Sequence, residues 1–267
     1  MLKDIHKISS NFGVEALRTL GPRQYAGMLA KLVPAAPQIR VSRKLVALDE
    51  RMSQRITVQM LGTSLVIDCK TIDQMVPEGS FTFGLIREIF FRNCYLRYAD
   101  IQAPQSLENA VDLGGNRGLF TLVASVFAKR VLYVEAQDVY RPVVKRLMAD
   151  NHRTNYDMEN VFVGGSADFK RENYAWVDFQ TLLDKHRMPT VDFLKVDIEG
   201  SEFELFRTLK CLDRVRFIAM EVHRQYGDPR ELVDILNRHR FQVITCDTLF
   251  NETSTMDKVD FLYARHP

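Results

Sequence analysis

The feature that most constrains the fold is an alternation of short apolar runs with helical stretches, which begins near residue 108. Continuous apolar runs of this length are typical of parallel strands buried on both faces by helices. The predicted strands span residues 109–113, 131–135, 161–164, 191–197, 217–222, 241–246 and 259–264. The predicted helices between them span residues 119–128, 140–151, 202–209 and 229–239. We therefore expect an α/β fold with a doubly wound, mostly parallel sheet.

The end of the chain departs from this alternation. Residues 247–258, which join the last two predicted strands, have no helical pattern. Such a short connection suits an antiparallel pair better than a right-handed crossover between parallel strands. We expect the last strand to be antiparallel to the others.

The first part of the chain has a different pattern. Residues 14–33 suit two short helices broken at Gly21-Pro22, with Pro34 and Pro37 ending the stretch. A predicted hairpin covers residues 55–69, and an apolar, aromatic helix is predicted over residues 85–98. We expect residues 1–104 to form an N-terminal α+β extension that covers the substrate, and residues 105–267 to form the ligand-binding domain.

Charge disfavours some partners. The 267 residues contain 36 Lys and Arg against 34 Asp and Glu, a net charge of +2, so no global field attracts nucleic acid or a membrane. Residues 1–55 are locally basic, with ten Lys and Arg against four Asp and Glu. Nucleic acid is thus an unfavoured partner, and the sequence leaves self-association open.

Cysteine usage and apolar run lengths bear on location. The four cysteines are far apart and form no CxxC pair, which favours a reducing compartment over a disulfide framework. The first residues lack the apolar stretch of a signal peptide, and the longest apolar run, residues 119–128, is too short to span a bilayer. We expect a cytoplasmic protein with no membrane partner.

A glycine loop follows the first predicted strand of the sheet. Asp112 precedes it, and the glycines fall at Gly114, Gly115 and Gly118. The spacing is not the G-x-G-x-x-G of dinucleotide sites, but glycines allow the backbone to approach a ligand closely. Ligands of open α/β sheets bind beyond the carboxyl ends of the strands. Asp112 is expected to accept a hydrogen bond there or to fix the loop.

An acid ends the next predicted strand. Glu135 lies 23 residues after Asp112, about the separation at which an acid binds ribose hydroxyls in nucleotide-binding α/β folds. Taken alone, the glycine loop could be only a tight turn, and the acid could be only a solvated strand end. Together, in the correct strand–helix order, they favour a ligand with an adenosyl group.

Four segments resemble the FkbM family of S-adenosylmethionine-dependent methyltransferases. They are Val111-Asp-Leu-Gly-Gly-Asn-Arg-Gly-Leu-Phe-Thr-Leu, Tyr133-Val-Glu-Ala, Phe193-Leu-Lys-Val-Asp-Ile-Glu-Gly-Ser-Glu and Met220-Glu-Val-His. The resemblance covers roughly residues 105–265; Gly115 stands where the family usually has Ala. It implies the seven-stranded class I methyltransferase fold, S-adenosyl-L-methionine as cofactor, and O-methylation of a sugar or polyketide-type hydroxyl. It also places Ser166 near the adenine, while Asp197 is expected to help bind the cofactor.

Methyl transfer to a hydroxyl needs a group that takes the proton or polarises the oxygen. Asp197 ends the fourth predicted strand; Glu221 and His223 end the fifth, two residues apart and so on the same side. We expect these three to be the catalytic residues, with His223 as the base. A structural histidine is the alternative interpretation.

No metal site is assigned from the sequence. A Mg²⁺ or Mn²⁺ site built from Asp197, Glu199, Glu221 and His223 is chemically reasonable and stays open as an alternative. The Lys195 ammonium is expected to pair with a nearby carboxylate. Glu202 and Glu204 are expected on a solvated helix face.

Competing functions differ in how well the motifs fit them. Methylation of base amino groups is disfavoured, because Asp197-Ile-Glu-Gly stands where an Asn/Asp-Pro-Pro-aromatic run is usual. An NAD(P)-dependent reductase lacks both the fingerprint and a Tyr-x-x-x-Lys pair. RNA 2′-O-methylation and a non-enzymatic binding module on this fold are the alternatives left open.

Overall fold

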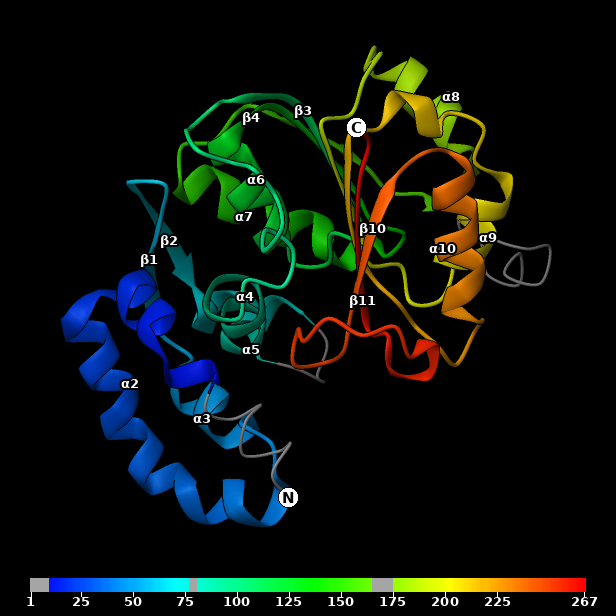
Figure 1. The fold of residues 1–267 in the computed structure, drawn as a ribbon. Coiled ribbons are helices and arrows are strands. Elements are labelled where there is room, and N and C mark those ends of the chain that lie inside the picture. The colour runs from blue at the N-terminus through cyan, green and yellow to red at the C-terminus, as the bar shows by residue number, and fades with distance from the viewer. Residues whose placement is uncertain (1–9, 77–80, 165–174) are drawn as a thin grey trace. The chain divides into compact units, whose positions relative to one another are not determined.

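The structure is a computed structural model that describes residues 10–76, 81–164 and 175–267 (Figure 1). The chain divides into two compact units. One comprises Met1–Cys94, Arg117–Val126 and Val139–Thr154, and the other Tyr95–Asn116, Phe127–Asp138 and Asn155–Pro267. We describe each by itself. The role predicted for residues 1–104, that of covering a substrate, stays a prediction.

The first unit is built from helices around a β-hairpin. Its elements are η1 (Ser10–Phe12), α2 (Val14–Ser42), α3 (Val46–Arg51), β1 (Arg55–Met60), β2 (Thr63–Asp68), α4 (Cys69–Met75), α5 (Thr82–Ile86), the π-helical turn η2 (Arg87–Phe91), α7 (Arg141–Asp150) and all but the last residue of α6 (Leu119–Phe127). The hairpin is antiparallel as predicted, with Met60 opposite Thr63 across the turn. The helix predicted over residues 85–98 is shorter, because η2 ends at Phe91.

Helix α2 contradicts the expected stop at Pro34. The helix interrupts its regular geometry at Gly21, where φ is 70°, as the Gly21-Pro22 pair predicts. It then continues through Pro34 and Pro37 to Ser42. Each proline lacks the N–H that would bond to the carbonyl four residues earlier. These carbonyls belong to Ala30 and Val33, which are exposed, so water can replace the missing donor.

The second unit contains the predicted seven-stranded sheet. Its elements are β3 (Leu107–Leu113), β4 (Ala128–Val134), β5 (Tyr156–Glu159), β6 (Phe162–Val163), β7 (Trp176–Val177), α8 (Phe179–Lys185), β8 (Phe193–Val196), α9 (Glu202–Thr208), β9 (Phe217–Glu221), α10 (Pro229–Arg238), β10 (Gln242–Cys246) and β11 (Phe261–Arg265). The strand order is β10-β11-β9-β8-β3-β4-β5. Strand β11 runs antiparallel to both neighbours, and the other pairs are parallel. The doubly wound, mostly parallel sheet with an antiparallel last strand is confirmed.

The core of this unit lies between one face of the sheet and helices α8, α9 and α10. Alternate strand residues point to that face, and they pack against Phe179, Leu182, Phe203, Phe206 and Leu236 of the helices. The sheet residues of this core are Val111, Leu113, Leu132, Val134, Leu194, Val196, Ile218, Met220, Leu262 and Ala264. Residues between them, such as Asp112 and Lys195, belong to the opposite face because side chains alternate along a strand.

The prediction that residues 161–164 form a strand of the large sheet is wrong. The edge strand there is β5, which pairs with β4. Residues Phe162 and Val163 instead form β6, which pairs with β7 in a separate two-stranded parallel sheet. Strand β5 is Tyr-Asp-Met-Glu and has no continuous apolar run, because an edge strand is not buried on both sides.

Two further expectations can be compared with the structure. All four cysteines are free and buried, so none forms a disulfide. Within the described residues, no helix is long and apolar enough to cross a membrane.

Candidate active site

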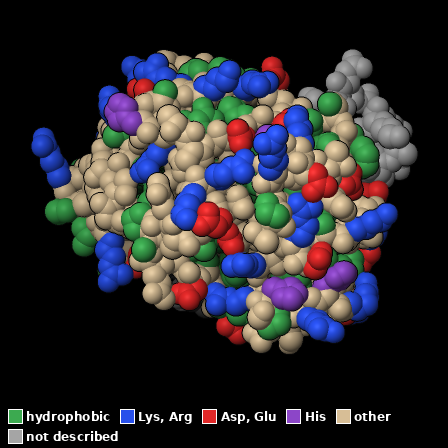
Figure 2. Space-filling model, turned by 90° about the horizontal axis from the view of Figure 1, so that it is seen from above, with side chains coloured by type: hydrophobic (Ala, Val, Ile, Leu, Met, Phe, Trp, Pro, Cys, Tyr) green, Lys and Arg blue, Asp and Glu red, His purple; other side chains and the backbone are tan. Residues whose placement is uncertain are grey.

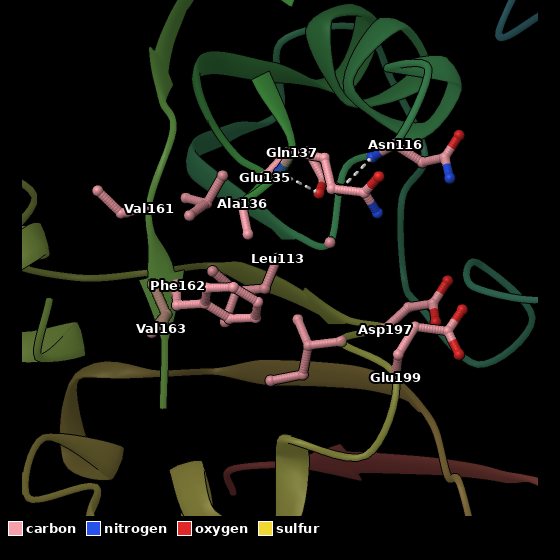
Figure 3. A pocket seen from close by; sticks show the side chains of 13 residues that line it. Leu113, Asn116, Glu135, Ala136, Gln137, Val161, Phe162, Val163, Asp197 and Glu199 are labelled. Carbon is pink, nitrogen blue, oxygen red and sulfur yellow. Dashed lines mark hydrogen bonds between the residues drawn. The ribbon is translucent and has the colours of Figure 1, made fainter. Parts of the chain in front are cut away.

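A pocket lies at the carboxyl ends of β3, β4 and β8 (Figure 3). Its lining comes from the loops after these strands and from the segment around β6, and consists of Leu113, Gly114, Asn116, Val134, Glu135, Ala136, Gln137, Val161, Phe162, Val163, Asp197, Ile198 and Glu199. Figure 3 shows Val161 and Phe162 at one end, Asp197 and Glu199 at the other, and Glu135 between them. The pocket therefore has an apolar end and an acidic end.

Gly114 is a position that only glycine fits. Its φ is +73°, which L side chains rarely adopt, and a Cβ there would lie 1.6 Å from the Asp197 carbonyl oxygen. The Gly114 and Gly115 N–H groups both donate to the Val134 carbonyl, at 2.9 and 3.1 Å. The loop after β3 is thus pressed against the ends of β4 and β8.

The other two predicted loop glycines do not line the pocket. A Cβ on Gly115 would lie 2.3 Å from the Tyr133 ring. Gly118 belongs to the first unit, where a Cβ would lie 2.8 Å from Val144 Cγ2. Each glycine is explained by close packing inside its own unit, and a role in binding a cofactor stays a prediction for both.

Glu135 is held in a defined orientation by the backbone. Its two carboxylate oxygens accept the N–H groups of Asn116, at 3.0 Å, and Gln137, at 2.9 Å. Burial raises the pKa of this carboxyl from its ordinary value, although these two N–H groups and the charge of Lys195 oppose the effect. Each oxygen keeps a second lone pair that can accept from a ligand hydroxyl. Glu135 lies where the sequence predicts it, in the pocket and beside the glycine loop.

A buried ion pair lies beneath the loop. Lys195 and Asp112 are register partners on the parallel strands β8 and β3, and both side chains are fully buried, with Lys195 Nζ 3.2 Å from Asp112 Oδ1. Lys195 also donates to the Gly114 carbonyl at 2.7 Å and lies 3.6 Å from Asp197 Oδ2. Burial alone would lower the pKa of Lys195, but Asp112, Asp197 and Glu135 outweigh it and raise that pKa. The expected carboxylate partner of Lys195 is therefore Asp112.

This pairing changes the interpretation of Asp112. The residue does not line the pocket, and its contact is with Lys195 rather than with the space where a ligand would lie. Of the two roles considered from the sequence, holding the loop fits this position. Direct contact between Asp112 and a cofactor stays an untested prediction.

Asp197, Glu199 and His223 converge at the acidic end of the pocket. His223 Nε2 lies 3.3 Å from Glu199 Oε2 and 3.8 Å from Asp197 Oδ1. Tyr95, the first residue of the second unit, donates its hydroxyl to Asp197 Oδ2 at 2.9 Å. One ligand atom from each of Asp197, Glu199 and His223 lies within 4.8 Å of the others, a spacing that could hold a metal ion. Three of the four residues of the alternative metal site considered from the sequence therefore lie together, and Glu221 is the one that does not join them.

Glu202 contacts the Nδ1 side of the His223 ring, whereas Asp197 and Glu199 face Nε2. The sequence places Glu202 on a solvated helix face, which is wrong, because the residue is fully buried. Its Oε1 accepts the His223 backbone N–H at 2.7 Å and lies 3.1 Å from Nδ1, while its Oε2 accepts the Gly200 N–H at 2.8 Å. Burial alone would lower the pKa of His223, but Glu202, Asp197 and Glu199 raise it to about 9.

Two predicted site residues are not brought into this cluster. Glu221 is half-buried at the end of β9, where it pairs in register with Phe261, and it does not line the pocket. Ser166 lies outside the described residues. The catalytic role of Glu221 and the adenine contact of Ser166 stay predictions.

The sequence analysis missed Tyr95 and Glu202 beside the acidic cluster, and it did not single out Asn116 and Gln137, whose N–H groups orient Glu135. Tyr95 is 102 residues away from Asp197 along the chain, in a segment with no motif. For Glu202, the signal was present in the run Asp197-Ile-Glu-Gly-Ser-Glu, which carries three acids at one strand end, but helical periodicity alone does not tell a buried acid from an exposed one.

A comparison with protein-family models agrees with two of the four resembling segments, those that begin at Phe193 and Met220. Residues 176–243 match a model of the methyltransferase FkbM domain, which confirms the resemblance over that segment. No curated protein matches the chain.

Solved structures give more distant likenesses. Methyltransferase FkbM from Methylobacillus flagellatus KT is 18% identical, with a TM-score of 0.45, over 73% of this chain and 57% of that one. A putative SAM-dependent methyltransferase from Streptococcus mutans is 11% identical, with a TM-score of 0.46, over 79% of this chain and 55% of that one. An rRNA methylase from Streptococcus thermophilus is 13% identical, with a TM-score of 0.41, over 62% of this chain and 90% of that one. At this distance none of them assigns a substrate.

Proposed function

We propose that this protein is an S-adenosyl-L-methionine-dependent methyltransferase that methylates a hydroxyl of a sugar or polyketide-type small molecule. The observation that carries the proposal is the oriented carboxylate of Glu135, in a pocket whose other walls are the glycine loop, an apolar end and an acidic end. The match of residues 176–243 to the methyltransferase FkbM domain supports methyltransferase activity.

The pocket's chemistry fits the parts of this cofactor. The apolar end, with Val161, Phe162 and Val163, suits an adenine ring, and the Glu135 oxygens suit the two ribose hydroxyls. The acidic end, with Asp197 and Glu199, suits the positively charged sulfonium and amino groups. When bound, the cofactor would supply an activated methyl group; the protein's own residues bind and orient it.

The acceptor is proposed to approach at the acidic end, beside His223 and Asp197. Transfer of a methyl group is an in-line displacement, so alignment of the hydroxyl supplies much of the rate enhancement. His223 is proposed to take the hydroxyl proton at Nε2, because Glu202 holds its Nδ1 side. Its raised pKa means that His223 must lose a proton before it can act as this base.

The metal alternative has different requirements. A divalent ion held by Asp197, Glu199 and His223 would polarise the acceptor oxygen and would replace the base. Activity that is lost with EDTA and restored with Mg²⁺ would select this alternative.

A small molecule is preferred to RNA as the acceptor. The net charge of +2 gives no global attraction for a phosphate backbone, and basic and acidic side chains are interspersed on the face drawn in Figure 2. An acceptor screen that includes ribosomal RNA beside hydroxylated sugars and polyketides, read out by S-adenosylhomocysteine release, separates the two. Release with none of these would favour the non-enzymatic binding module.

Replacing Glu135 tests the cofactor site. We expect Glu135→Ala and Glu135→Gln to weaken S-adenosylhomocysteine binding by about 5- to 150-fold, which corresponds to about 1–3 kcal/mol for lost charge-assisted hydrogen bonds. Protonation of Glu135 removes the negative charge that binds the ligand. Because the pKa of Glu135 is raised, the affinity of the wild type should begin to fall, as the pH is lowered, at a higher pH than it would with an ordinary glutamate. Calorimetric titration measures both.

Glu108→Ala is the matched control. It removes an exposed carboxylate near the opposite end of β3, and its affinity should stay within about twofold of the wild type. Wild-type affinity in folded Glu135→Ala would show that Glu135 does not bind the ribose.

A further inference from the structure

The outer side of α2 is an apolar surface without a partner in the part of the chain that the structure describes. We define the outer face of α2 as the exposed apolar residues Ala26, Leu29, Ala30, Val33, Pro34, Pro37 and Val41. Their spacing of three and four residues places them on one side of the helix. Val33 is 74% exposed and Val41 is 87% exposed.

The opposite side of α2 already has its partners. Met28, Ala35 and Ile39 are buried, and Gln24 exchanges hydrogen bonds with the Thr57 backbone on β1. Helix α2, drawn in blue in Figure 1, runs beside α3. A helix that is apolar on two opposite sides needs a second apolar environment, because a helix at a protein surface normally turns its polar side to water.

Positive charge predominates around this face, although Glu15 pairs with Arg18 and the exposed Glu50 follows in α3. Residues 16–48 contain Arg18, Arg23, Lys31, Arg40, Arg43 and Lys44 and not one Asp or Glu. Arg23 and Arg40 are exposed near the two ends of the outer face, and Arg43 and Lys44 follow directly after the helix. The partner is therefore expected to combine an apolar layer with negative charge.

We propose that the outer face of α2 docks the protein on an anionic membrane surface, with the helix lying in the plane of the interface. Small and aliphatic side chains enter the boundary between headgroups and acyl chains, and the flanking basic residues contact the anionic headgroups. A second copy of the chain fits less well, since it would bring the same six positive charges. RNA fits less well because the face has no aromatic side chain for stacking.

We expected no membrane partner because the net charge is small and the apolar runs are short. Neither observation excludes a helix that lies on the membrane surface. A helix that lies on a membrane needs no spanning segment. The local basic excess was evident from the sequence, whereas the exposure of Val33 and Val41 is evident only from the fold.

Co-sedimentation with vesicles tests the proposal on the full chain. The wild type should sediment with vesicles of phosphatidylcholine mixed with phosphatidylglycerol and not with phosphatidylcholine alone, and added salt should release it. The double variant Val33→Glu/Val41→Glu should lose more than about tenfold in binding. Both positions are exposed, so its circular dichroism melting curve should match that of the wild type.

The matched control is Gln180→Glu/Gln242→Glu, which adds the same two negative charges at exposed positions of the second unit. It should keep wild-type vesicle binding. The proposal is overturned if the wild type does not bind the anionic vesicles, if Val33→Glu/Val41→Glu binds them equally well, or if the control loses as much binding. It is also overturned if light scattering shows that the outer face is covered in a dimer, which Val33→Glu/Val41→Glu dissociates, or if the face binds RNA in place of vesicles.

Discussion

Replacing Lys195 by Met is expected to lower the free energy of unfolding by about 3–5 kcal/mol, the usual cost of removing one partner from a buried ion pair. Lys195 is 4% exposed and its partner Asp112 is 0% exposed. The variant leaves the buried Asp112 carboxylate without its cation and removes the donor to the Gly114 carbonyl. Urea unfolding of the wild type and the variant measures the difference.

A double-mutant cycle with Asp112→Asn identifies the cause. If the cost comes from the uncompensated charge, Lys195→Met/Asp112→Asn should be more stable than Lys195→Met alone. A cost below about 1 kcal/mol for Lys195→Met, or a double variant whose cost equals the sum of the single ones, would mean that the pair does not stabilise the fold. The raised pKa of Lys195 keeps its charge at neutral pH, and this contribution should be lost only at strongly alkaline pH, as Lys195 deprotonates.

Replacing His223 by Ala is expected to lower kcat by about 10²- to 10⁴-fold, the usual effect of losing a positioned base. The measurement uses a hydroxyl acceptor selected by the screen. Affinity for S-adenosylhomocysteine should stay nearly unchanged, because His223 does not line the pocket. His239→Ala, which changes an exposed histidine at the end of α10, is the control and should keep wild-type kcat.

The pH profile gives this prediction a second readout. Because the pKa of His223 is raised to about 9, the free protein holds the base protonated at neutral pH. Wild-type kcat/KM should therefore rise with pH towards about 9, and His223→Ala should lose this rise. A variant that keeps wild-type kcat across the same range would remove His223 from the mechanism.

The large sheet could be predicted because its central strands are buried on both sides. Most residues of strands β3, β8 and β9 are apolar, and the short final connection indicated the antiparallel β11. The edge strand β5 could not be found in this way, because Tyr156–Glu159 alternates like a solvated segment and the more apolar residues 161–164 lie next to it.

The site was predictable where chemistry and strand position coincide. Glu135, Asp197 and Gly114 all line the pocket as strand-end residues. What could not be predicted depends on contacts between distant segments, such as the hydrogen bond from Tyr95 to Asp197. Burial was the other limit, since Glu202 has the sequence pattern of an exposed helical acid, yet its buried carboxylate orients His223.

The central claim is that the pocket beside Gly114 and Glu135 binds S-adenosyl-L-methionine, and isothermal calorimetry tests it most directly. S-adenosylhomocysteine and NADPH would be titrated separately into the folded wild-type protein. We expect saturable heat with one site per chain for S-adenosylhomocysteine, and none for NADPH. The absence of heat with S-adenosylhomocysteine at high-micromolar concentration, or tighter binding of NADPH, would contradict the proposed function.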